Sequence, residues 1–95
     1  QLRSTERVAH FLCEIDALYR QRHIRGTTFA LHMSRGEIGD YLGLTIETVS
    51  RSMGKLKKRG LIGLVGIDGI VVLDRAKLRA VGKVGADPAR SDAAF

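Results

Sequence analysis

The sequence contains little of what stabilises a secreted protein and nothing that could span a membrane. A single cysteine in 95 residues excludes an internal disulfide framework, so the chain does not require an oxidising compartment. No apolar run approaches the ~18 residues of a membrane span, and the N-terminus lacks the apolar region of a signal peptide. Acidic residues are outnumbered by basic ones, 10 to 16, and the formal net charge is +6. The composition predicts a soluble, intracellular protein with a polyanionic partner, either nucleic acid or an acidic membrane surface.

The length of 95 residues suits one small domain. Because the chain begins with Gln1 rather than methionine, we expect it to be a piece of a longer protein. Residues 83–95 are small and polar and hold the only proline, so we predict a disordered C-terminal tail there. Residues 1–82 are then the folded domain.

The first part of the chain predicts a helix followed by a strand. Ser4 is a candidate cap for an amphipathic helix over residues 4–22, and Cys13 falls on its polar side. The stretch 27–33, which follows Gly26, is rich in β-branched and aromatic residues and predicts a short strand. The apolar face of the helix is formed by Val8, Phe11, Leu12, Ile15, Leu18 and Tyr19.

Two closely spaced helices are expected next. Ser34 with Glu37 three residues later is the capping-box pattern of a helix start, and Gly43 ends this short helix. Thr45 is the cap candidate of the following helix, which extends to Gly60. Helices so close together must cross steeply, as they do in a helix-turn-helix.

A hairpin follows the second of these helices. The stretch "LIGLVGIDGIVVLD" has two apolar runs around "GIDG", and Asp74 can cap a final short helix that ends at Gly82. A hairpin directly after a helix-turn-helix is the wing of a winged helix. We therefore predict a winged helix-turn-helix, mainly α with a small antiparallel sheet.

The helix at residues 46–59 has two chemically different sides when it is rotated by about 100° per residue. One side carries the apolar residues Val49, Met53 and Leu56, with Ile46 near them. The opposite side carries Glu47, Arg51, Gly54 and Lys58, with Ser50 at its edge. We predict that this outward side is the surface that a recognition helix inserts into the major groove of DNA.

Three side chains near the start of this helix are candidate base contacts. Arg51 can bond two acceptors of guanine, and Glu47 can accept from the amino group of cytosine. Ser50 can meet the edge or methyl group of a neighbouring base. Positions i and i+4 are neighbours on a helix, so Glu47 is also expected to hold the Arg51 guanidinium in place. The candidate DNA-backbone contacts are Thr45, Thr48, Lys55, Lys57, Lys58 and Arg59.

Other interpretations remain open. Glu47 and Arg51 could form an ordinary surface salt bridge, and the basic helix end could serve the helix dipole alone. The domain could be a protein-interaction module with an acidic partner, or a non-specific nucleic-acid binder. His10, His23 and His32 lack ligand spacing, so no metal site is expected. No nucleophile and base pair is evident, so an enzyme is not expected.

The segments "MSRGEIGDYLGLTIETVSR" and "GLIGLVGIDGIVVLD" resemble the DNA-binding domain of the Crp/Fnr family of bacterial transcription regulators. The arrangement of Glu47, Ser50 and Arg51 is similar to the Fnr and FixK-like branch, whereas the cyclic-AMP branch has glycine at the position of Ser50. The resemblance extends weakly to "TERVAHFLCEI". At the wing tip, Ile67 and Asp68 stand where a basic residue would help, which argues against a wing–phosphate contact.

The resemblance implies several expectations for the whole protein. It implies base reading by Glu47, Ser50 and Arg51 at TTGA-type half-sites of double-stranded DNA. It also implies an N-terminal sensory β-barrel and a dimerisation helix outside this chain, a homodimer, RNA polymerase as a partner and a bacterial cytoplasmic location. No cofactor is expected in this domain, because any effector would bind the N-terminal portion.

Overall fold

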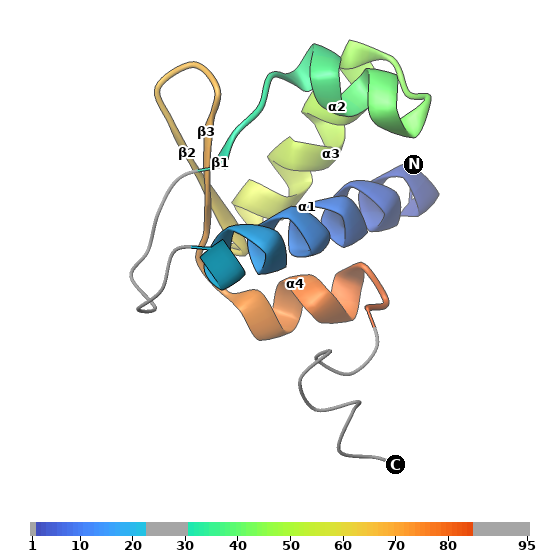
Figure 1. Ribbon diagram of the computed structural model, residues 1–95. Coiled ribbons are helices and arrows are strands. Elements are labelled where there is room, and N and C mark those ends of the chain that lie inside the picture. The colour runs from blue at the N-terminus through green and yellow to red at the C-terminus, as the bar shows by residue number, and fades with distance from the viewer. Residues whose placement is uncertain (1, 23–30, 85–95) are drawn as a thin grey trace.

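The computed structural model describes residues 2–22 and 31–84. Helix α1 crosses the middle of the molecule, with α4 on one side of it and α2 and α3 on the other (Figure 1). A small three-stranded sheet lies at one end of these helices (Figure 1). The elements are α1 (Leu2–Arg22), β1 (Leu31–His32), α2 (Arg35–Leu42), α3 (Ile46–Lys58), β2 (Ile62–Val65), β3 (Gly69–Val72) and α4 (Arg75–Val81). No helix within the described residues is long and apolar enough to cross a bilayer.

Helix α1 is the central support of the fold. It begins at Leu2, so the predicted cap Ser4 lies inside the helix, where it is buried. Leu18 was predicted on the apolar face but is 51% exposed, because it lies towards the end of α1 beyond the best-covered turns. The rest of the predicted face packs inward, with Val8, Phe11 and Leu12 buried and Ile15 and Tyr19 partly buried against the same core.

The prediction that Cys13 lies on the polar side of its helix is wrong. Cys13 is 7% exposed, because α4 covers that side of α1. Burial raises the pKa of the Cys13 thiol from 9.0 to about 11, with the positive charge of Arg79 opposing the shift. A cysteine with so high a pKa is almost entirely a neutral thiol at physiological pH.

The predicted helix-turn-helix is confirmed. Ser34 and Glu37 form a complete capping box at the start of α2, and Gly43 ends this helix in the left-handed conformation with φ +72°. Gly39 allows the turn to close, since a Cβ at this position would lie 2.5 Å from the backbone oxygen of Leu44. Close packing at Gly39 therefore fixes how α3 leaves the turn.

The predicted hairpin is confirmed and forms part of a larger sheet. Strands β2 and β3 pair antiparallel, and β1 adds to the far side of β3, giving the order β1-β3-β2. Within the predicted strand 27–33 the structure assigns β1 to two residues only, and residues 27–30 lie outside the described part. The pairing of Leu31 with Ile70 joins segments 39 positions apart, which no local pattern predicts.

Helix α4 closes the domain over α1. Asp74 caps it and Gly82 follows its last residue, as predicted. The buried carboxylate of Asp16 in α1 holds Arg75 through two bonds, of 2.5 Å to Nε and 3.1 Å to Nη2. Val84 still packs against the core, so the packed chain extends beyond the predicted boundary at residue 82. The predicted tail beyond Val84 lies outside the described residues.

Candidate nucleic-acid interface

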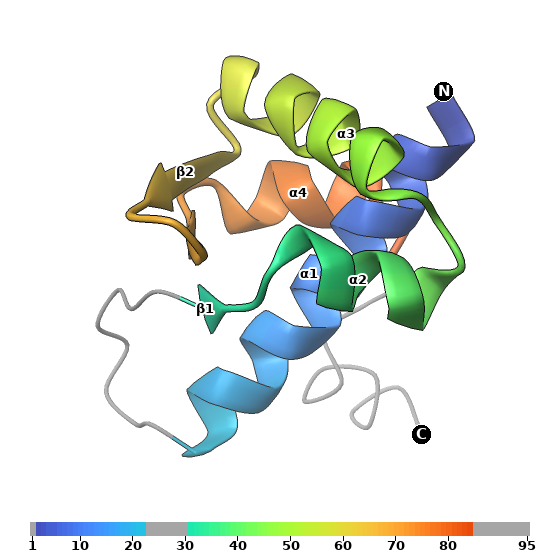
Figure 2. The same ribbon diagram turned by 90° about the horizontal axis from the view of Figure 1, so that it is seen from above.

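Helix α3 is fixed to the domain by one side and exposed on the other. Val49, Met53 and Leu56 are buried in the core, as the helical spacing predicts, whereas Ile46, expected near them, is 56% exposed in the first turn. Ser52 is buried beside them and accepts a hydrogen bond of 3.4 Å from the Thr5 hydroxyl of α1. Viewed from above, α3 lies along the outer side of the domain next to the wing (Figure 2). The fold therefore presents the opposite face of α3 to solvent.

The three predicted base-contacting residues lie together at the N-terminal end of this exposed face. Glu47 and Arg51 are exposed, and Ser50 is half-buried at the edge. The predicted bracing of Arg51 by Glu47 is not present, because no ion pair within 4 Å joins these two described side chains. Isolated surface pairs gain little in water and cost side-chain entropy. Both charged groups therefore remain available to an external partner.

The basic residues at the C-terminal end of α3 divide into two groups. Lys55, Lys58 and Arg59 meet around a hollow of about 390 Å³ that Thr5 also lines. Lys57 does not line this hollow, since its helical position places it on the other edge of α3. Among the described residues, no ion pair within 4 Å engages any of these four cations. Their positive charges are thus free to meet phosphate.

Two of the predicted backbone contacts already have structural roles at the start of α3. The Thr45 hydroxyl accepts a hydrogen bond of 3.1 Å from the Thr48 backbone N–H, which makes Thr45 the N-cap. The same hydroxyl lies 2.9 Å from that of Thr48. Thr45 is exposed and Thr48 half-buried, so both stand beside the exposed face of α3 while they hold its first turn.

The wing is anchored by a residue that the sequence analysis did not single out. The Arg35 guanidinium, from the first turn of α2, donates to the Ile67 backbone oxygen at the wing tip over 3.4 Å. The Ile67 side chain itself is 88% exposed. Arg35 and Ile67 are 32 positions apart, and no sequence signal short of the complete fold brings them together. Arg35 therefore adds one contact between α2 and the wing tip, beside the bond of 3.3 Å from the Met33 N–H to the Asp68 backbone oxygen.

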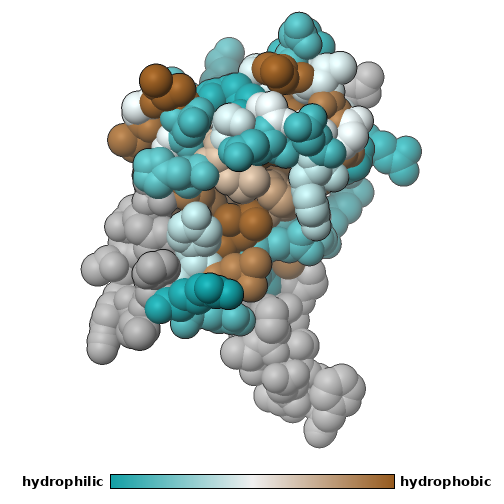
Figure 3. Space-filling view, turned by 45° about the horizontal axis from the view of Figure 1, so that its top comes forward, coloured by the Kyte–Doolittle hydropathy of each residue, from teal (hydrophilic) through white to brown (hydrophobic). Residues whose placement is uncertain are grey.

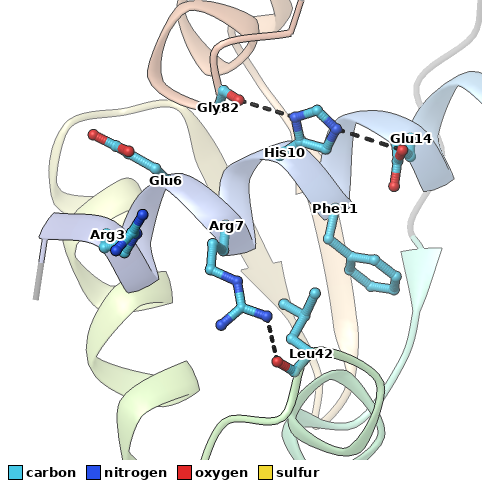
Figure 4. Close-up of a pocket in the computed structure, with 8 residues that line it drawn as sticks. All are labelled: Arg3, Glu6, Arg7, His10, Phe11, Glu14, Leu42 and Gly82. Carbon is cyan, nitrogen blue, oxygen red and sulfur yellow. Dashed lines mark hydrogen bonds and ion pairs between the residues drawn. The ribbon is translucent and has the colours of Figure 1, made fainter.

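A second cluster of titratable groups lines a pocket of about 260 Å³ between α1 and the ends of α2 and α4 (Figure 4). Two of its polar side chains bond to other parts of the chain. Arg7 donates to the Leu42 backbone oxygen, while His10 lies 3.0 Å from the Gly82 oxygen and 3.4 Å from Glu14. These contacts join three helices and leave no nucleophile beside a base. Within the described ranges, no three His, Cys, Asp or Glu side chains gather as metal ligands.

A wider groove of about 660 Å³ follows the second half of α1. Phe11, Ile15 and Leu18 line it from α1, and Tyr41 lines it from α2 with its ring centroid 5.0 Å from that of Phe11. Apolar side chains gather in the middle of the molecular face in Figure 3, with hydrophilic ones around them. This groove is predominantly apolar and carries no row of cations, unlike the exposed face of α3.

The exposed face of α3 is thus the surface with the chemistry of duplex recognition. It combines directional donors and acceptors near the helix start with free cations near its end. A protruding helix has a diameter that the major groove admits, and its N-terminal side chains then reach the base edges. Cations on its flanks reach the phosphates on either side.

Comparison with known proteins matches this arrangement. Residues 6–81, which are most of the chain, match the family of Crp-like helix-turn-helix domains. The transcriptional activator protein anr of Pseudomonas aeruginosa is 43% identical over 76 residues, covering 80% of this chain and 31% of that protein. The fumarate and nitrate reduction regulatory protein of Escherichia coli is 43% identical over 61 residues, covering 64% of this chain and 24% of that protein.

The solved structure of FixK2 from Bradyrhizobium japonicum has the same fold. It superposes with a TM-score of 0.68 at 42% identity, covering 87% of this chain and 40% of that one. The chain therefore spans less than half the length of each of these relatives.

Proposed function

The chain belongs to the Crp-like helix-turn-helix family of the Crp/Fnr transcription regulators, and on this premise we propose that it binds specific duplex DNA by inserting α3 into the major groove at TTGA-type half-sites. The observation that carries the proposal is the exposed set of Glu47, Ser50 and Arg51 at the start of α3. Arg51 bonds guanine, Glu47 accepts from cytosine, and Ser50 contacts the adjacent base. Phosphate contacts come from Thr45, Thr48, Lys55, Lys57, Lys58 and Arg59.

The carboxylate of Glu47 distinguishes this function from simple phosphate binding. A surface built only to attract polyanions gains nothing from an acidic residue near its N-terminal end, because that charge repels phosphate. A carboxylate that accepts from a base amino group offsets this repulsion only at the correct sequence. Glu47 therefore supports specific recognition over the alternatives of a non-specific binder or a module for acidic proteins.

The other proposed partners, a second subunit, RNA polymerase and an effector, are partners of a longer protein that contains this domain. The relatives are more than twice as long as this chain, which supports a domain that acts within a larger regulator. In this proposal the regulator is a cytoplasmic bacterial homodimer that places two domains on a two-fold symmetric site and contacts RNA polymerase. Its effector binds outside this domain, which itself acts by binding rather than by catalysis.

Replacing Arg51 tests the proposed base contact. Arg51→Ala should weaken binding to a TTGA-containing duplex by about 1–3 kcal/mol, because a bidentate contact to guanine is lost. Binding to a scrambled duplex of equal length should change much less. Fluorescence anisotropy titrations with both duplexes measure the two effects.

The matched control is Lys57→Ala, which also removes one exposed cation of α3. As a phosphate contact, Lys57 should weaken binding to both duplexes by the same factor. If Arg51→Ala likewise weakens both duplexes equally, Arg51 is a phosphate contact. If the unmodified chain does not prefer the TTGA duplex at all, the proposed specificity is wrong.

A further inference from the structure

A glycine stands in the middle of the exposed face of α3. Gly54 is exposed and lies two turns after Glu47, about 20° from it around the helix axis. Ser50 and Lys58 are its neighbours one turn before and one turn after. Gly54 therefore occupies the centre of the surface proposed to enter the major groove.

Nothing within the described chain requires glycine at this position. Its backbone is helical rather than left-handed, unlike that of Gly43. A Cβ built on Gly54 would meet no atom within 4 Å, whereas one on Gly39 would lie 2.5 Å from a backbone oxygen. Glycine in a helix interior also lowers helix stability relative to alanine. The domain thus carries a destabilising residue without an internal packing reason.

We infer that Gly54 is the point of closest approach between the α3 backbone and the duplex, so that its missing side chain sets the depth at which α3 lies in the major groove. This inference rests on the proposed function. A helix with its side chains is about 10–12 Å wide and the major groove about 12 Å wide, so the fit leaves little free space. A methyl group at the centre of the inserted face holds the helix further out.

The consequence falls on the neighbouring base contacts. Hydrogen bonds to base edges weaken steeply beyond about 3.2 Å and away from linear geometry. An outward displacement of the helix by about 1 Å therefore disrupts the bidentate contact of Arg51, one turn away from Gly54. Flexible lysines such as Lys58 follow the phosphates over the same displacement. Gly54 is thus a positioning residue for specificity more than for affinity to any duplex.

Two substitutions of different size test this inference in the 95-residue chain. Gly54→Ala should raise the melting temperature by about 4–8 °C, since alanine favours the helix. It should nevertheless weaken binding to a TTGA-containing duplex about tenfold, and Gly54→Leu should weaken it further. The loss on a scrambled duplex should be smaller for both variants. Thermal unfolding and anisotropy titrations of the same samples give both readouts.

Gly36→Ala is the matched control. Gly36 lies in α2, and its added Cβ meets only side-chain atoms of Ile46 and Ser34, both at an ordinary 3.8 Å. This variant should gain stability and keep the affinity of the wild type. The inference is overturned if Gly54→Ala binds the TTGA duplex as tightly as the wild type does. In that case a specific loss in Arg51→Ala still supports the proposed function, whereas absent TTGA preference in the wild type defeats the function itself.

Discussion

At the scale of single residues, the contact between α1 and α4 contains the most unusual ionisation in the domain. Asp16 is 4% exposed and Arg75 neutralises it through two hydrogen bonds, which in turn raise the pKa of the guanidinium. Cys13, one turn earlier on α1, has no such cationic partner within bonding distance, and its thiol is held in the neutral form by burial. The interface between α1 and α4 thus holds the ionised Asp16 because Arg75 pairs with it. It disfavours the Cys13 thiolate, which has no such partner.

The buried thiol predicts a loss of stability at alkaline pH. The folded pKa of Cys13 is about 11 and the ordinary value is 9.0, so the unfolded chain releases the thiol proton first. The contribution of Cys13 is fully present below about pH 9 and is lost as the pH rises from there towards 11. Urea unfolding across this interval should show that the free energy of unfolding falls more steeply with pH for the wild type than for Cys13→Ala. The difference in slope corresponds to at most one proton released on unfolding. Parallel curves for the two proteins would show that the thiol ionises equally easily in both states.

At the scale of the elements, local capping chemistry fixes where α2, α3 and α4 begin. Each N-cap side chain, on Ser34, Thr45 and Asp74, accepts a hydrogen bond from the backbone three residues later. Such caps satisfy backbone N–H groups that have no partner within the helix. The start of α3 is functionally the most important, since Glu47 lies in its first turn.

The cap of α3 predicts a coupled loss of stability and binding. Thr45→Ala should lower the free energy of unfolding by about 1 kcal/mol, because the Thr48 N–H loses its acceptor. Thr45→Ser keeps the hydroxyl and should retain most of this stability. Chemical denaturation gives the stability and titration with a TTGA duplex gives the affinity. If Thr45 acts only as the cap, Thr45→Ser should regain both the stability and the DNA affinity that Thr45→Ala loses.

The same local chemistry explains how much could be predicted from the sequence. Ser34, Gly43 and Asp74 determine helix boundaries through neighbours at most a few residues away, and these boundaries were predicted within one or two residues. The exposed face of α3 followed from helical spacing alone. Features formed by distant segments were not predictable, because they depend on the assembled fold. Examples are the burial of Cys13 under α4 and the contact between Arg35 and the wing.

At the scale of the whole molecule, charge is distributed unevenly around the domain. The net charge is +6, and the acidic side chains in the ion pairs of α1 and α4 neutralise part of the positive charge on those helices. The cations at the end of α3 have no such partners among the described residues. These unpaired cations add positive charge where we propose that DNA binds, and this charge steers the domain towards DNA.

This distribution predicts a defined dependence of binding on salt. Each phosphate contact releases condensed counterion, so three to five contacts give a slope of about −2.7 to −4.5 for log affinity against log salt. One domain should bind a half-site only at about micromolar concentration or more weakly at physiological salt.

A longer regulator that joins two domains should gain orders of magnitude in affinity for a two-fold site and much less for a half-site. Nanomolar binding of the 95-residue chain alone to the full site would contradict this account.

Hydrogen bonds from the start of α1 also tie it to the helix-turn-helix. Thr5 bonds to Ser52 of α3, and Arg7 bonds to the last turn of α2 at Leu42. Both residues lie in the first two turns of α1, and they bond to different helices of the helix-turn-helix. Because Gly39 packs α2 closely against the start of α3, the first two turns of α1 hold the two helices in one fixed arrangement. A displacement of this end of α1 would therefore move the surface of α3 as well.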